Sequence, residues 1–179
     1  MNVETRVYTA EELLAMPRKP GYELVEGELR AMSPSGFRHG TIISRIDGHL
    51  RAHVDAHLLG EVTSGEAGFV LARQPDTIRA PDVGFVRAER VTETTGFFPG
   101  PPDLAIEVIS PSDRENDVAA KTLEYLRAGT RAVVLIDPET RAVAVHRTSG
   151  VTQIANILTV DEVVPGWSLP LADLFTTVR

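Results

Sequence analysis

Apolar and polar positions alternate along the chain with two different periods, and the longest regular stretch has the period of a helix. Between residues 38 and 59 apolar side chains recur every four positions, at Ile42, Ile46, Leu50, Val54 and Leu58. This spacing predicts a long amphipathic helix with these five side chains facing inward. A second helix is expected to begin with a cap at Ser112 or Asp113 and to reach about Ala128, because Gly129 suits the left-handed end of a helix.

Shorter apolar runs with strand character occupy most of the remaining chain. They cover residues 61–63, 68–71, 81–86, 103–109, 132–136 and 142–146, separated by turns that contain Gly or Pro. Near the N-terminus, residues 22–25 and 29–32 flank a Glu26-Gly27 turn and predict a hairpin. Before them, Thr9 and Glu12 form a capping box for a short helix that Pro17 should end.

This order of elements indicates the fold class. A strand at 103–109, a helix at 113–128 and a strand at 131–136 predict a parallel pair with a right-handed crossover, whereas the hairpins predict antiparallel neighbours. We therefore expect an α/β (α+β mixed) protein with a mixed β-sheet flanked by helices on both faces. No internal repeat or low-complexity linker divides the sequence, so residues 1–179 are expected to form a single domain.

Composition narrows the function classes. The chain has no cysteine, which excludes a disulfide framework, a thiolate metal site and a thiol nucleophile. No leader-like segment or long apolar run occurs, so we expect a cytoplasmic protein without membrane contact. A net charge of −7 argues against non-specific coating of nucleic acid but leaves room for one local basic groove.

Two carboxylates interrupt strands that otherwise look buried. Asp82 lies at the entry of the apolar run 81–86, and Glu107 lies inside the run 103–109. Burying one carboxylate costs free energy, and two close together repel each other unless a cation lies between them. A hard ion such as Mg²⁺ accepts oxygen ligands of this kind, so Asp82 and Glu107 are candidate metal ligands.

Lys121 is the third candidate. Only two of the 18 basic residues are lysines, so a lysine at this position is an uncommon choice for this chain. If Val118, Thr122, Tyr125 and Leu126 face inward, Lys121 lies about 60° to one side of Val118 and can reach the edge of the sheet. A lysine beside a metal ion and a phosphate can stabilise developing negative charge or orient the attacking water.

An ordered series of short motifs resembles a known family. Pro81-Asp82 followed by Glu107-Val108-Ile109 resembles the PD-(D/E)XK nuclease signature, except that Ile109 stands where the lysine is usual; some branches of the superfamily carry that lysine on the next helix, as at Lys121. More narrowly, the chain resembles the Uma-type restriction endonuclease family of bacteria over residues 8–147. The matching segments are residues 22–29, 32–34, 38–39, 80–83, 107–112, Lys121 and Tyr125.

The resemblance implies a restriction-endonuclease-like core and Mg²⁺-dependent (or Mn²⁺-dependent) hydrolysis of phosphodiester bonds in nucleic acid, with DNA as the first candidate substrate. It implies that Asp82 and Glu107 hold the metal and that Lys121 assists. Glu23 and His39 match further positions of the family: Glu23 is a candidate additional ligand, and His39 could contact phosphate or act as a base. Enzymes that cut duplex DNA often work as dimers, so a homodimer is a candidate assembly.

Other interpretations of the same residues stay open at this point. The alternative function is a catalytically inactive module of the same fold that binds nucleic acid or a protein partner. Glu23 could pair with an arginine across its hairpin, and His39 could be a capping or core residue. His49, His53 and His57 are spaced by four, but the outer two lie about 12 Å apart along a helix, so we expect a polar margin there and no zinc site.

Overall fold

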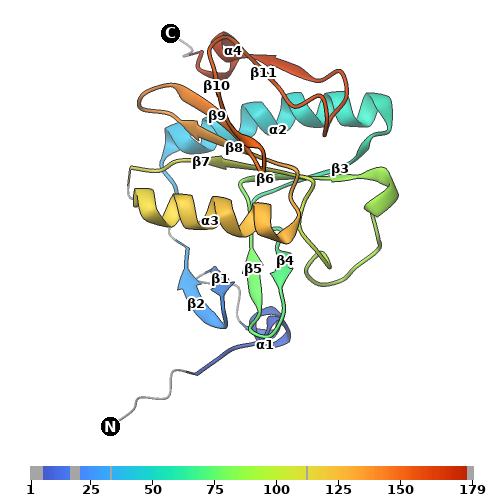
Figure 1. The fold of residues 1–179 in the computed structure, drawn as a ribbon, viewed down its shortest axis with the longest axis vertical. Coiled ribbons are helices and arrows are strands. Elements are labelled where there is room, and N and C mark those ends of the chain that lie inside the picture. The colour runs from blue at the N-terminus through green and yellow to red at the C-terminus, as the bar shows by residue number, and fades with distance from the viewer. Residues whose placement is uncertain (1–5, 17–20, 33, 112, 177–179) are drawn as a thin grey trace.

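A mixed sheet of six strands forms the centre of the molecule in the computed structural model, which describes residues 6–16, 21–32, 34–111 and 113–176 (Figure 1). The strand order is β10-β9-β8-β7-β6-β3, and only the β7–β8 pair is parallel. The strands are β3 (Gly60–Ser64), β6 (Val83–Arg87), β7 (Leu104–Val108), β8 (Ala132–Asp137), β9 (Ala142–Arg147) and β10 (Gly150–Ile154). The expected mixed sheet is confirmed.

Helices α2 (Phe37–His57) and α3 (Glu115–Ala128) lie on opposite faces of this sheet (Figure 1). Of the five side chains predicted to face inward from α2, four are buried in the main core, whereas Leu58 is 84% exposed. The prediction for Leu58 is wrong because the helix ends at His57 and Leu58 adopts the left-handed cap conformation, with φ 54°. No helix in the described part of the chain is long and apolar enough to cross a membrane.

A second, smaller sheet carries the N-terminal hairpin. Its order is β2-β1-β5-β4, with β1 at Tyr22–Val25, β2 at Glu28–Ala31, β4 at Phe69–Ala72 and β5 at Thr77–Arg79. Glu26 and Gly27 both have positive φ, at 49° and 81°, as the predicted two-residue turn requires. Helix α1 (Ala10–Ala15) begins with the predicted capping box between Thr9 and Glu12. Pro17 lies outside the described residues.

The crossover from β7 through α3 to β8 sets the position of the candidate site. Its helix ends as predicted at Gly129, which has φ 109°, but it begins later than expected, with Arg114 at the N-cap. Asp113 does not cap the helix, because its carboxylate accepts a hydrogen bond from the Ser110 amide. The other predicted cap, Ser112, lies outside the described residues.

The sequence predicted no element beyond residue 147; β10 adds an end strand to the large sheet, and the chain after β10 closes over α2. After β10 come β11 (Ile157–Thr159), β12 (Ser168–Pro170) and α4 (Leu171–Leu174), and a short 3-10 helix, η1 (Ala88–Arg90), follows β6. Trp167, Leu169 and Leu174 belong to the same buried cluster as the inward side chains of α2. The Arg45 guanidinium donates to the Leu174 carbonyl at 3.1 Å and ties α2 to this C-terminal segment.

Candidate active site

The alternation of side chains along β7 delivers Glu107 to the α3 side of the sheet. Leu104, Ile106 and Val108 point into the core beneath α2, whereas Ala105 packs with Tyr125 of α3. Since successive side chains of a strand point to opposite faces, Glu107 shares the face of Ala105. One face of this strand is therefore all core, and the other carries a carboxylate toward a helix.

Two side chains of α3 meet Glu107 at the same oxygen. Lys121 Nζ lies 2.9 Å from Glu107 Oε1, and the Tyr125 hydroxyl donates to that oxygen at 2.9 Å. Lys121 and Tyr125 are one helical turn apart and so project from the same side of α3. Among the described residues, Glu107 Oε2 has no hydrogen-bond partner. One carboxylate oxygen is thus held by the protein and the other is available.

Asp82 lies beside Glu107 on the neighbouring strand. It directly precedes β6, which pairs antiparallel with β7 so that Val83 lies opposite Ile106. Asp82 Oδ2 accepts a hydrogen bond from the Val108 amide at 2.7 Å, and His39 Nε2 of α2 lies 3.5 Å from the same oxygen. The predicted pair of carboxylates is therefore brought together.

His39 approaches the pair from the opposite helix. Its side chain is 11% exposed, and its Nδ1 atom is buried without a hydrogen-bond partner among the described residues. The hydrogen bond to Asp82 raises the pKa of His39 above its ordinary value, although burial works in the other direction. The charged imidazolium is therefore favoured in this position.

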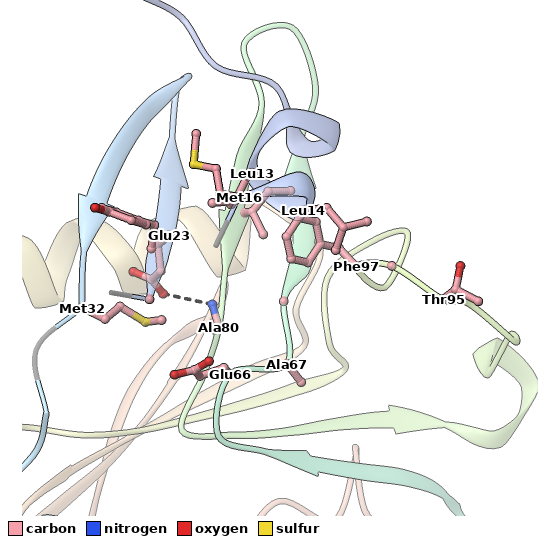
Figure 2. Close-up of a pocket in the computed structure, with 15 residues that line it drawn as sticks. Leu13, Leu14, Met16, Glu23, Met32, Glu66, Ala67, Ala80, Thr95 and Phe97 are labelled. Carbon is pink, nitrogen blue, oxygen red and sulfur yellow. Dashed lines mark hydrogen bonds between the residues drawn. The ribbon is translucent and has the colours of Figure 1, made fainter. Parts of the chain in front are cut away.

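Glu23 reaches the site from the smaller sheet, but both of its oxygens are engaged. Oε1 lies 3.1 Å from Lys121 Nζ and accepts from the Ala80 amide at 3.0 Å, the contact drawn in Figure 2, and Oε2 accepts from Arg79 at 2.7 Å. Burial opposes ionisation of Glu23, yet Lys121 and Arg79 outweigh it and keep its pKa below the ordinary value. The arginine partner is Arg79 of β5, whereas the residue opposite Glu23 in the hairpin register is Arg30.

Arg79 extends the network beyond the residues that the sequence pointed to. Its guanidinium binds Glu23 on one side and forms a two-point pair with Glu124 of α3 on the other, at 2.7 and 3.1 Å. The sequence indicated Glu23 but neither Arg79 nor Glu124. The three residues of strand β5, which carries Arg79, are too few to show a pattern. Tyr125 was expected on the inward side of its helix, but only the structure shows its hydroxyl on Glu107.

Burial and the neighbouring charges set the ionisation of the central pair. Loss of solvent raises the pKa of Glu107, Lys121 lowers it and Asp82 raises it, and the balance of these effects is a pKa of about 7. Burial also disfavours the Lys121 ammonium, but Glu107 and Glu23 outweigh that effect and hold its pKa above the ordinary value. A cation and a partly protonated carboxylate thus coexist near neutral pH.

The donor set fits a hard divalent cation with two protein ligands. No group of three or more His, Asp or Glu side chains suited to a metal occurs in the described part of the chain. Asp82 and Glu107 still offer adjacent carboxylates, and Mg²⁺ is commonly bound by one or two carboxylates together with water. The third acidic candidate, Glu23, is held by Lys121 and Arg79 and does not add to this pair.

A cavity of about 230 Å³ opens beside Glu23 (Figure 2). Leu13, Leu14, Met16 and Phe97 form an apolar wall, and Glu23 and Glu66 supply carboxylates. The cavity contains no basic side chain among its described lining residues, so it is poorly suited to an anionic group.

Several other polar residues are accounted for without a functional role. Among the described residues the three histidines of α2 form no metal cluster, and His53 is bound to the Pro165 carbonyl at 2.9 Å. Arg87 and Arg90 both pair with Asp103, which is 2% exposed. These two arginines therefore anchor a buried carboxylate.

Comparisons with known proteins support the fold. A crystal structure of a "putative nuclease" from Anabaena variabilis superposes with a TM-score of 0.81 at 25% sequence identity, covering 93% of this chain and 97% of that chain. None of the curated proteins compared with the chain matches it. The fold and its likeness to this solved structure thus place the chain among α/β proteins with a nuclease-like fold.

A family model described as "Uma2: Putative restriction endonuclease" matches residues 10–172. The chain belongs to this family. The match extends into the C-terminal segment that closes over α2, well past residue 147, where the recognisable motifs end.

Proposed function

We propose that this protein is a metal-dependent nuclease that hydrolyses phosphodiester bonds of nucleic acid, with DNA as the first candidate substrate. The observation that carries the proposal is the meeting of Asp82, Glu107 and Lys121 where β6 begins and β7 ends. One oxygen of the Glu107 carboxylate is available there. Membership of the Uma2 family supports the same activity.

Asp82 and Glu107 would hold Mg²⁺ or Mn²⁺. A divalent ion in such a site would lower the pKa of the attacking water and neutralise negative charge on the phosphate. The protein contributes by fixing the two carboxylates: the Val108 amide holds Asp82, and Tyr125 and Lys121 hold Glu107. Each ligand therefore presents one oxygen in a set direction.

Lys121 would stabilise the negative charge that develops on the phosphate during attack. Its ammonium is held between Glu107 and Glu23, and the Arg79–Glu124 pair in turn fixes Glu23. We therefore assign Glu23 to positioning of Lys121. The alternative assignment of Glu23 as a metal ligand conflicts with the contacts of both its oxygens.

His39 would contact phosphate or the bound water through its imidazolium. A base must accept a proton, whereas contact with Asp82 favours the protonated ring. We therefore favour a phosphate contact for His39.

The test is a panel of supercoiled plasmid, single-stranded DNA and RNA incubated with Mg²⁺ or Mn²⁺, with the wild type beside Glu107→Gln and Lys121→Met. Cleavage by the wild type that both variants lose is the expected result. Cleavage that persists in both variants would show that another site or a contaminant is responsible. No cleavage, together with oligonucleotide binding that needs no metal, would favour the inactive binding module.

A further inference from the structure

The outer side of α3 carries a stripe of residues that no other part of the described chain covers. Glu115, Ala119, Leu123 and Arg127 follow one another at intervals of four and are all exposed, Leu123 to 48%. Residues four apart form a ridge along a helix, and such ridges are the surfaces by which helices pack together. Neither Glu115 nor Arg127 forms an ion pair with any described residue.

An apolar groove runs beside this ridge. A cavity of about 450 Å³ lies between α3 and strands β8 to β10, and its walls include Val118, Leu126, Leu135 and Val151. Val151 is 57% exposed. A single exposed apolar side chain is ordinary, but a ridge with Leu123 at its middle beside an apolar groove forms a contiguous apolar surface of the kind found at interfaces.

The charges at the two ends of the groove are opposite. Asp113 and Glu115 lie at the N-terminal end of α3, beside the C-terminal ends of β7 and β8. Arg127 lies in the last turn of α3 and so at the other end of the ridge. His146 lines the groove near the start of β8, but burial lowers its pKa, so it adds no positive charge there near neutral pH. A polypeptide that lies antiparallel to α3 and carries the same charge order therefore meets opposite charges at both ends.

We propose that a second copy of this chain occupies this surface, with its α3 antiparallel to the first across a two-fold axis. Placing Glu115 against Arg127 of the second copy puts Ala119 against Leu123 of the second copy in the same register. When two copies of this ridge pack antiparallel, each acidic residue meets a basic one and each small side chain meets a large one. An isologous interface requires such complementarity of a surface with itself. An acidic residue at the start of a helix and a basic residue at its end also interact favourably with the helix dipole, which accounts for Glu115 and Arg127 separately. The helix dipole does not explain why Ala119 and Leu123 lie between them.

This assembly leaves the candidate active site open. Lys121 and Leu123 are two residues apart and so point about 200° away from each other around the helix. Each copy would therefore keep its own Asp82–Glu107–Lys121 site facing away from the ridge, and the proposed dimer does not depend on the proposed nuclease activity.

The test is the molar mass in solution by sedimentation velocity and light scattering, over a range of protein concentrations. The wild type should be a dimer, and Leu123→Glu should be a monomer because it buries a charge at the axis. Leu58→Glu is the matched control, since Leu58 is 84% exposed at the far end of the other helix, and it should remain a dimer. A monomeric wild type, or a Leu123→Glu variant that stays dimeric, would overturn the proposal.

Charge reversal tests the register itself. Glu115→Arg and Arg127→Glu each create two like-charge pairs across the axis and should weaken the dimer by about tenfold or more. The double variant restores opposite charges and should recover most of the wild-type affinity. Circular dichroism melts check that each variant is folded. If the double variant is as weak as the sum of the single ones, the antiparallel register is wrong.

Discussion

Replacing Lys121 by Met should destabilise the protein in a way that depends on pH. The change removes the ammonium that lies 2.9 Å from Glu107 and 3.1 Å from Glu23, while most of the aliphatic stem remains. The two carboxylate side chains are only 15% and 10% exposed, so they are left without their common cation in a poorly solvated place. Removing one partner of a buried ion pair typically costs about 3–5 kcal/mol.

The pH dependence follows from Glu107. Burial raises its pKa from 4.5 to about 7 even though Lys121 lowers it, so the variant's pKa must lie above 7. A carboxyl group with a raised pKa contributes stability fully below its unfolded pKa and loses it as pH rises through the folded pKa, at about 1.4 kcal/mol per pH unit. In the wild type this loss ends near pH 7, whereas in the variant it continues. The difference between the two proteins should therefore grow above pH 7 by about 1.4 kcal/mol per unit, up to the variant's own pKa.

Urea unfolding in EDTA at pH 6, 7, 8 and 9 measures this difference. Arg131→Met serves as the control, because Arg131 is exposed and its removal leaves the site unchanged. If the free-energy difference between wild type and Lys121→Met is the same at all four pH values, Lys121 is not the counter-ion of Glu107, and the electrostatic account of the site fails.

Two further changes probe the surroundings of the site, and a third probes a buried ion-pair cluster outside it. Tyr125→Phe keeps the buried ring but removes the hydrogen bond to Glu107; it should cost about 1 kcal/mol in urea unfolding and lower the cleavage rate. His39→Gln should destabilise more at pH 5.5 than at pH 8.5 in thermal melts, because a histidine with a raised pKa stabilises the fold at low pH and loses this effect as pH rises through that pKa. Asp103→Asn leaves two arginines beside a neutral amide and should cost about 3 kcal/mol without changing the cleavage rate per folded molecule.

Periodicity predicted the elements whose side chains repeat over several turns or strands. Helix α2 was found from its four-residue spacing, and the β7–α3–β8 unit from an apolar run, a helix with a glycine end and a second apolar run. Strand β5 was missed because three residues are too few to show alternation. Strands β11 and β12 and helix α4 were missed because they are short and bury their apolar residues only after packing in the main core. Strand β10 was missed because it buries none of its residues and so shows no apolar alternation.

The two carboxylates of the candidate site could be predicted for a different reason. A carboxylate inside an apolar strand is costly, so Asp82 and Glu107 stand out in the amino-acid sequence itself. Arg79 and Glu124 carry no such signal, since charged residues on short strands and helix surfaces are common. Their roles depend on Arg79 lying between Glu23 and α3, and this arrangement arises only when the smaller sheet docks against the helix.

The most direct test of the central claim is the single-turnover cleavage rate of a labelled oligonucleotide at saturating Mn²⁺. Wild type should be compared with Glu107→Gln and with Glu61→Gln, a matched change of an exposed carboxylate on β3. We expect cleavage by the wild type and by Glu61→Gln at equal rates, and a loss of at least about a hundredfold in Glu107→Gln. Equal rates for all three proteins would contradict the assignment of the site.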